Sequence, residues 1–139
     1  MVIPWEGPFF PTEASRRAPA ESLTRILVVD DEPSLRRSVA ALLQGSDRLI
    51  EDCGFVAETL ARLNTRSYDL LILDFRLPDA SGLAVMDWLL SNDRRESVIM
   101  ISGEQSMEAA IGALRRGADD FLIKPYGADQ IRRAVTGAL

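Results

Sequence analysis

The sequence predicts an α/β domain with a parallel sheet of five strands and helices on both of its faces. Short apolar runs at 26–29, 49–50, 70–73, 98–101 and 121–123 alternate with five stretches of helical periodicity. Such alternation implies right-handed crossovers between parallel strands. The unbroken run at 70–73 is typical of a strand buried on both faces. A chain of 139 residues suits one domain of this kind.

Residues 1–22 are predicted to be an extension outside the main fold, which we expect to span 23–139. Four of the seven prolines lie in this segment, and no core periodicity is visible. The segment is nevertheless more apolar than a typical disordered tail. Its large apolar residues include Val2, Ile3, Trp5, Phe9 and Phe10. It is either a flexible leader or a segment that buries Trp5 or the Phe9-Phe10 pair against its own domain or a partner.

The first two strand–helix units follow the extension. The strand at 26–29 ends in acids, and Pro33 suits the first turn of a helix that stops near Gly45. The apolar positions of that helix are Leu35, Val39, Leu42 and Leu43. The second strand, 48–52, is flanked by charge, as expected at a sheet edge. Val56, Leu60 and Leu63 indicate the second helix.

The last three units repeat the pattern. Asp74 ends the strand at 70–73, Pro78 turns the chain, and Ser81 is the expected N-cap of the third helix. The strand at 98–101 closes with Ser102-Gly103, and the strand at 121–123 closes with Lys124-Pro125. The apolar positions that indicate the three helices are Leu83, Met86, Leu89 and Leu90, then Met107, Ala110, Ile111 and Leu114 before Gly117, and finally Ile131, Val135 and Leu139.

Composition excludes several classes of function. The net charge of -5 argues against nucleic acid or an anionic membrane as a direct partner. Cys53 is the only cysteine, and no signal peptide is visible, so a cytoplasmic location is expected. The chain has no histidine, so it cannot carry a phosphohistidine or bind metal through imidazole.

The residues that end the apolar strands form the candidate site. In a parallel sheet these ends lie on one edge, which brings together Asp30, Asp31, Asp74, Ser102 and Lys124. Three adjacent carboxylates repel one another, and a hard cation such as Mg²⁺ removes the repulsion. Asp31 and Asp74 are the candidate ligands, with Asp30 holding a metal-bound water and Lys124 as a donor to phosphate oxygens. The acidic first turn lacks the glycines of a nucleotide site, which argues against flavin or nucleotide binding.

These motifs together resemble the receiver domain of bacterial two-component response regulators. They are Val-Val-Asp-Asp-Glu-Pro33, the stretch from Asp74 to Gly82, Ser102-Gly103 and Lys124-Pro125, in the family's order and spacing over about 23–139. The resemblance implies a flavodoxin-like, doubly wound fold with strand order 2-1-3-4-5. It also implies a partner, which is a histidine kinase or a histidine phosphotransfer protein.

The resemblance assigns roles residue by residue. Asp74 is implied to be the phosphoacceptor, and Mg²⁺ is implied to bind Asp31, Asp74 and the backbone carbonyl of Arg76, with Asp30 assisting through water. Ser102 and Lys124 are implied to contact the phosphoryl group. Phe121 matches the family's aromatic switch, which reports to the face formed by the fourth helix, fifth strand and fifth helix. A homodimer through that face is a further expectation.

Two residues at the mouth of the site are expected to influence the lifetime of the phosphoryl group. Arg76 lies two positions after Asp74, and Glu104 lies two positions after Ser102. Their opposite charges suggest a pair that hinders the in-line approach of water. An exposed pair contributes only about 0 to 1 kcal/mol, so the expected effect is modest.

Two other classes of function compete with this interpretation. A Mg²⁺-dependent aspartyl-phosphate phosphotransferase or phosphatase also uses strand-end aspartates. Such enzymes usually carry a second acid two residues after the nucleophile, where this chain has Arg76. A degenerate receiver used only for docking is the other alternative, and the complete set of acids, hydroxyl and lysine argues against it. The preferred interpretation is a phosphoaccepting regulator rather than an enzyme.

Overall fold

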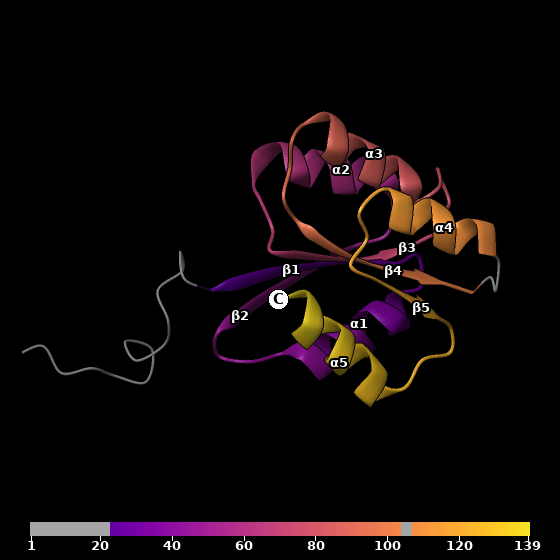
Figure 1. Ribbon diagram of the computed structural model, residues 1–139. Coiled ribbons are helices and arrows are strands. Elements are labelled where there is room, and N and C mark those ends of the chain that lie inside the picture. Colours follow the sequence, from indigo (N-terminus) through magenta and orange to yellow (C-terminus); the bar gives the residue numbers. More distant parts are fainter. Residues whose placement is uncertain (1–22, 104–106) are drawn as a thin grey trace, which may run out of the picture.

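The computed structural model describes residues 23–103 and 107–139, which form a three-layer α/β domain (Figure 1). The elements in chain order are β1 (Thr24–Val29), α1 (Pro33–Leu43), β2 (Arg48–Cys53), α2 (Val56–Thr65), β3 (Leu70–Asp74), α3 (Leu83–Ser91), β4 (Ser97–Ser102), α4 (Met107–Arg115), β5 (Asp120–Ile123) and α5 (Ala128–Ala138). All strand pairs are parallel, in the order β2-β1-β3-β4-β5. The predicted fold and strand order are confirmed. The predicted extension, 1–22, lies outside the described residues.

Helices cover both faces of the sheet, as predicted. Helices α2, α3 and α4 lie on one face, and α1 and α5 lie on the other (Figure 1). Every residue of the central strand β3 is buried, because both of its faces are covered. Leu71 and Leu73 point into the core on the α2–α3–α4 side, and Leu70 and Ile72 point into the core on the α1–α5 side. This division follows from the two-residue period of a strand.

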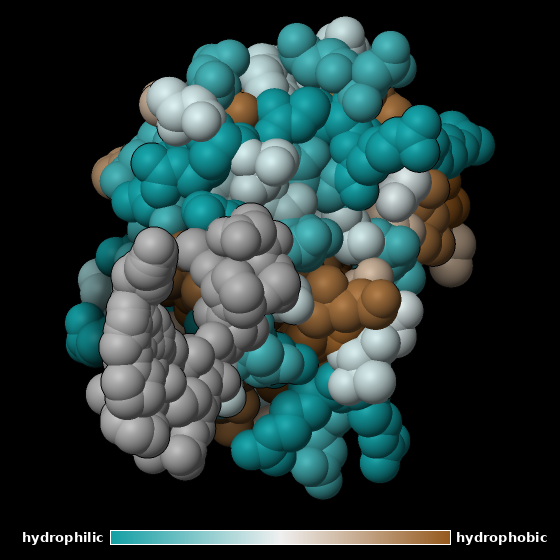
Figure 2. Space-filling view, turned by 90° about the vertical axis from the view of Figure 1, so that its left-hand side faces the viewer, coloured by the Kyte–Doolittle hydropathy of each residue, from teal (hydrophilic) through white to brown (hydrophobic). Residues whose placement is uncertain are grey.

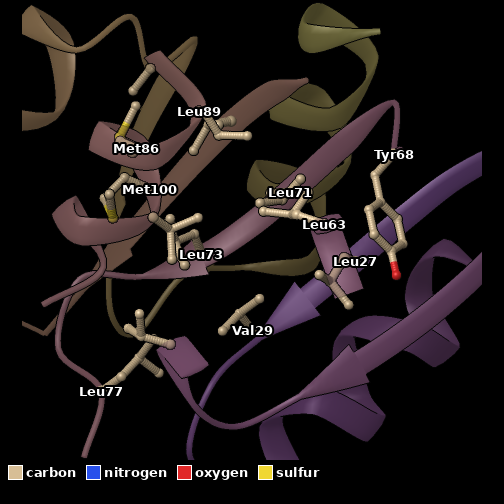
Figure 3. Close-up of a cluster of buried hydrophobic side chains, with 14 of the residues drawn as sticks. Leu27, Val29, Leu63, Tyr68, Leu71, Leu73, Leu77, Met86, Leu89 and Met100 are labelled. Carbon is tan, nitrogen blue, oxygen red and sulfur yellow. The ribbon is translucent and has the colours of Figure 1, made fainter. Parts of the chain in front are cut away.

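The core on the α2–α3–α4 side is built from large aliphatic side chains (Figure 3). Leu27 and Leu71 have no exposed surface, and Met86 and Met100 fill the space between α3 and the sheet. Burying each such side chain contributes about 1.5 to 3 kcal/mol. Apolar packing therefore holds the layers in position without help from the polar groups at the strand ends.

Helix α4 is present where it was predicted, but its large apolar residues do not face the core. Its buried residues are Ala109 and Ala113. Met107, Ile111 and Leu114 are exposed. The apolar periodicity that predicted this helix therefore marks its outer face, because the helix packs on the sheet through its alanines.

Three smaller details differ from the prediction. Helix α3 has Gly82 as its N-cap residue rather than Ser81, although the Ser81 hydroxyl still accepts a hydrogen bond from the N–H of Leu83 at 3.1 Å. Leu90 is 57% exposed, because it lies on the outer side of α3. Leu139 follows α5 and is exposed. Pro33 at the start of α1 and Gly117, with φ of 90° after α4, take their predicted places.

None of the helices in 23–103 and 107–139 combines the length and apolar character needed to cross a bilayer.

Candidate functional site

The register of the parallel sheet brings the predicted residues to one edge. Val29 pairs with Leu73, so Asp30 and Asp74 leave the sheet side by side. Ser102 pairs with Ile123 on the next two strands, which places Lys124 at the same edge. The backbone continues this alignment beyond the strands, since the N–H of Lys124 donates to the carbonyl of Ser102 at 2.8 Å.

Asp74 is a buried carboxylate held by two donors. Only 4% of its surface is exposed. Its Oδ2 lies 2.9 Å from Lys124 Nζ, and its Oδ1 accepts a hydrogen bond from the N–H of Arg76 at 3.1 Å. Both oxygens are thus oriented by neighbouring groups. A carboxylate that is already oriented needs little reorganisation before it can react.

Asp30 shares the same lysine. Its Oδ2 lies 3.0 Å from Lys124 Nζ, and its Oδ1 accepts from the N–H of Glu32 at 2.9 Å. Burial raises the pKa of Asp30, and the nearby charge of Asp74 adds to the rise, while the bonds from Glu32 and Lys124 oppose it. The ammonium of Lys124 lies between two buried carboxylates and reduces their mutual repulsion.

Lys124 is held firmly in its charged form. Burial alone would lower its pKa, but hydrogen bonds from its ammonium to Asp74 and Asp30, and the charges of both acids, raise the pKa well above its ordinary value. Glu32 Oε1 is a third, weaker partner at 3.9 Å. The site thus presents a permanent positive charge beside Asp74.

The three acids also form an oxygen cluster suited to a hard cation. One carboxylate oxygen each from Asp30, Asp31 and Asp74 lies within 4.8 Å of the others. Asp30 and Asp74 are buried, whereas Asp31 is exposed and opens the cluster to solvent. Oxygen donors at this spacing, with room for water on one side, fit the preference of Mg²⁺.

The remaining predicted residues lie around this cluster. Ser102 is 1% exposed at the end of β4. Phe121 is partly buried against the core on the α2–α3–α4 side. The backbone of Arg76 contacts Asp74 directly through its N–H. Glu104, the proposed partner of the Arg76 side chain, lies outside the described residues.

Sequence reasoning missed a residue that fixes the loop after Asp74. The carboxylate of Asp79 accepts hydrogen bonds from the N–H groups of Ala57 and Val56, both at 2.9 Å, and so caps the N-terminus of α2. These bonds lower the pKa of Asp79. The Pro78-Asp79 pair indicates a turn, but nothing in the sequence shows that the capped helix lies more than twenty residues upstream.

Two further neighbours of the site became visible only in the structure. Gly82 N–H donates to the carbonyl of Phe75 at 2.7 Å, and a Cβ at Gly82 would lie 2.3 Å from the Asp74 carbonyl oxygen. The only available signal for this was the glycine itself. The hydroxyl of Tyr126, two residues after Lys124, is buried with no hydrogen-bond partner in the part of the chain that the structure describes. No pattern in the sequence indicated that this hydroxyl would be buried.

Comparison with known proteins shows the family of the chain. The family model for the response regulator receiver domain matches residues 26–136. The chain is 34% identical to the regulatory protein AtoC of Escherichia coli over 121 residues, which cover 85% of this chain and 26% of AtoC. The chain spans about a quarter to a half of the length of the curated relatives it matches.

Solved structures show the same fold. The signal receiver domain of a putative Luxo repressor protein from Vibrio parahaemolyticus has a TM-score of 0.79 and 31% identity, over 84% of this chain and 89% of that one. The response regulator TrrA from Thermotoga maritima, in complex with Mg(2+)-BeF, has a TM-score of 0.74 and 28% identity, over 84% of this chain and 100% of that one.

The fold and the match to the family model define a signalling domain of the two-component type. The chain belongs to the receiver domain family of response regulators.

Proposed function

We propose that Asp74 is the residue that receives the phosphoryl group, and that the domain acts as a regulator rather than as an enzyme with turnover. The observation that carries this proposal is the buried Asp74 carboxylate, with Lys124 Nζ at 2.9 Å and oxygen atoms of two further carboxylates within 4.8 Å. Asp30 is also buried and lies 3.0 Å from Lys124 Nζ, but Asp74 is the acid that ends the central strand β3. The donor is a histidine kinase or a histidine phosphotransfer protein.

The transfer is an in-line displacement at phosphorus. A carboxylate oxygen of Asp74 forms the new O–P bond while the N–P bond of the phosphohistidine breaks, and the electron pair returns to the imidazole, which takes up a proton from solvent. The product is an acyl phosphate on Asp74. Lys124 stays charged throughout and contacts the phosphoryl oxygens, so the developing negative charge meets a preorganised donor.

The acidic cluster is the proposed Mg²⁺ site. Asp31, Asp74 and the backbone carbonyl of Arg76 would hold the ion, with Asp30 assisting through a bound water. When bound, Mg²⁺ would neutralise charge on the transferred phosphoryl group. Asp30 and Glu32 already position the turn that carries Asp31, through the bond from Glu32 N–H to Asp30 Oδ1.

The response is proposed to reach the outer face through β4 and β5. The Ser102 hydroxyl would donate to a phosphoryl oxygen, and Phe121 would turn inward as Ser102 moves. The face formed by α4, β5 and α5 would then change. Exposed apolar residues on this face, namely Met107, Ile111, Leu114 and Ile123, support a second copy of the domain as its partner.

The competing functions are less well supported by the site. An aspartyl-phosphate phosphatase would place an acid two residues after Asp74, whereas Arg76 stands there and already contacts Asp74 through its backbone. A receiver used only for docking has no need of Lys124 shared between two buried acids. We also propose that the domain works in the cytoplasm. The net charge of -5 supports the further proposal that it does not contact nucleic acid directly.

The test is intact mass measurement after treatment with acetyl phosphate. We expect one added phosphoryl group, lost on chelation of Mg²⁺ and lost in Asp74→Asn. Asp69→Asn is the matched control, because Asp69 is an exposed acid just before the other end of β3. Full phosphorylation of Asp74→Asn, or loss in Asp69→Asn alone, would refute the assignment.

The lifetime of the acyl phosphate tests the proposed pair of Arg76 and Glu104. If the two act as a unit, Arg76→Ala and Glu104→Ala each shorten the lifetime by less than about tenfold, and the double variant adds little. Additive effects, or longer lifetimes in the single variants, would show that the side chains act separately.

A further inference from the structure

A groove lies between the end of α1 and the beginning of β2. It is at the end of the sheet where β2 begins, whereas Asp74 is at the end where β3 finishes. Four of the groove's lining residues are apolar, namely Leu23, Ala40, Leu49 and Ile50, and the other four are Gln44, Gly45, Ser46 and Arg48. All four apolar side chains are only partly buried. The described residues therefore leave a depression with a partly apolar lining where the chain enters the domain.

The groove borders an open edge of the sheet. Strand β2 pairs only with β1 in the described part of the chain, so its outer edge has no neighbouring strand there. Figure 2 shows the side of the molecule on which β1 begins, where hydrophobic residues interrupt a largely hydrophilic surface. An exposed edge invites pairing with other chains, and covering it with a helix or loop is one of the ways in which proteins protect it.

The sequence supplies a segment of suitable chemistry at this position. Residues 1–22 join the domain at Leu23, which itself lines the groove. They include Trp5, Phe9 and Phe10. The 13 residue steps from Phe10 to Leu23 reach up to about 45 Å when extended, well beyond the ~20 Å length of β2.

The prolines of this segment decide how it would bind. Pro4, Pro8 and Pro11 flank the aromatic residues, and a proline cannot donate a hydrogen bond to a neighbouring strand. Side-chain packing therefore fits better than addition of a regular strand to β2. Trp and Phe side chains are the ones that contribute most by such packing.

We propose that residues 1–22 pack Trp5 into the α1/β2 groove of their own domain and so cover the open edge at β2. The groove lies at the end of the sheet where β1 and β2 begin, whereas Asp30, Asp74 and Lys124 lie at the end where the strands finish. Docking therefore leaves the acidic site accessible. The proposal does not depend on the phosphoacceptor function, and either can fail without the other.

The test follows Trp5 directly by ¹⁹F NMR of the full chain labelled with 5-fluorotryptophan. The chain has two tryptophans, so Trp5→Phe assigns the resonance. We expect the Trp5 signal to be shifted from its position in urea and protected from a soluble paramagnetic quencher. Ala40→Arg, which fills the groove with a long side chain, is expected to return the signal to the urea position and remove the protection.

The matched control is Ala61→Arg, the same substitution at an exposed position of α2, on the other face of the sheet. It is expected to leave the Trp5 signal unchanged. A full-chain stability cycle adds an independent readout: Trp5→Ser is expected to lower the unfolding midpoint in the wild-type background but not in the Ala40→Arg background.

Three results would overturn the proposal. The first is a Trp5 signal in the wild-type chain that matches the urea position and is fully accessible to the quencher. The second is an equal response to Ala40→Arg and Ala61→Arg, or no response to either. The third is loss of protection on dilution, which would mean that Trp5 packs against a second copy instead.

Discussion

Replacing Gly82 by alanine tests how closely the start of α3 approaches the phosphoacceptor strand. The added Cβ would lie 2.3 Å from the Asp74 carbonyl oxygen, where ordinary contact begins at 3.4 Å. The neighbouring atom belongs to the backbone and cannot rotate away. Either α3 or the end of β3 must therefore move by roughly an ångström.

Two opposing effects determine how much Gly82→Ala changes the free energy of unfolding. Overpacking against a fixed backbone costs about 3 kcal/mol, the upper end of its usual range. The backbone of Gly82 has φ of -57° and ψ of -22°, which alanine adopts readily, so reduced freedom of the unfolded chain returns up to about 1 kcal/mol. We expect a net loss of about 2 kcal/mol in the free energy of unfolding, or roughly 8 °C in Tm.

The displacement should also reach the chemistry. A shift of Asp74 by about an ångström relative to Lys124 is expected to slow phosphorylation by acetyl phosphate by up to about a hundredfold. Urea denaturation gives the stability, and intact mass against time gives the rate.

Gly103 provides the matched control for Gly82→Ala. It follows Ser102 beside the same site, and a Cβ there would meet no described atom within 4 Å. Gly103→Ala is expected to change the free energy of unfolding by less than about 0.5 kcal/mol. If Gly82→Ala is as stable and as reactive as the wild type, the predicted clash with the Asp74 carbonyl does not occur. Equal losses of stability in the Gly82 and Gly103 variants would also contradict it.

Three other predictions concern residues outside the acidic cluster. Tyr126→Phe is expected to leave the free energy of unfolding unchanged or raise it by up to about 1 kcal/mol in urea denaturation, because the lost hydroxyl has no described partner. Burial and a 2.6 Å hydrogen bond to Glu51 raise the pKa of Tyr68 to about 12, so the stability that wild type gains over Tyr68→Phe should be full below about pH 10 and lost by about pH 12. Arg94→Ala should cost about 3 kcal/mol by the same assay, because it leaves the Glu96 carboxylate, whose side chain is 2% exposed, without its cation.

Each of these predictions has a result that contradicts it. A loss of more than about 1 kcal/mol in Tyr126→Phe would mean that the hydroxyl is hydrogen-bonded. A constant difference between wild type and Tyr68→Phe across the alkaline range would show that Tyr68 is not perturbed. For the third, Arg95→Ala is the control, since Arg95 is exposed beside Arg94. Equal losses in the two arginine variants would rule out a specific role for the Arg94 contacts.

The strand–helix order and the acidic edge could be predicted because each depends on local features. The run at 70–73 has no polar residue, and only a strand covered on both faces accommodates it. Once the strands are parallel, their ends must meet, and Asp30, Asp74 and Lys124 meet with them. The strand order was predicted on another basis, because it came from the resemblance to a family and not from residue patterns.

What could not be predicted depends on contacts between distant segments. The face of α4 is an example: periodicity located the helix, but Ala109 and Ala113, rather than Ile111 and Leu114, turned out to be buried. Hydrophobicity ranks leucine above alanine for burial, whereas the close approach of this helix favours the smaller side chain. The cap that Asp79 provides to α2 is a second example. The sequence around a turn residue does not show which distant helix its side chain will cap.

The small anchors of α4 have a consequence for the energy landscape of the domain. Two buried methyl groups supply only about 1 to 2 kcal/mol of hydrophobic anchoring, whereas Val39 and Leu43 on α1 supply roughly 3 to 6 kcal/mol. Helix α4 is thus expected to belong to the least stable cooperative unit of the fold, with amide protons that exchange through local opening well below the global free energy of unfolding. A helix held so lightly needs only a small input of free energy to change its position, while the sheet beneath it stays rigid.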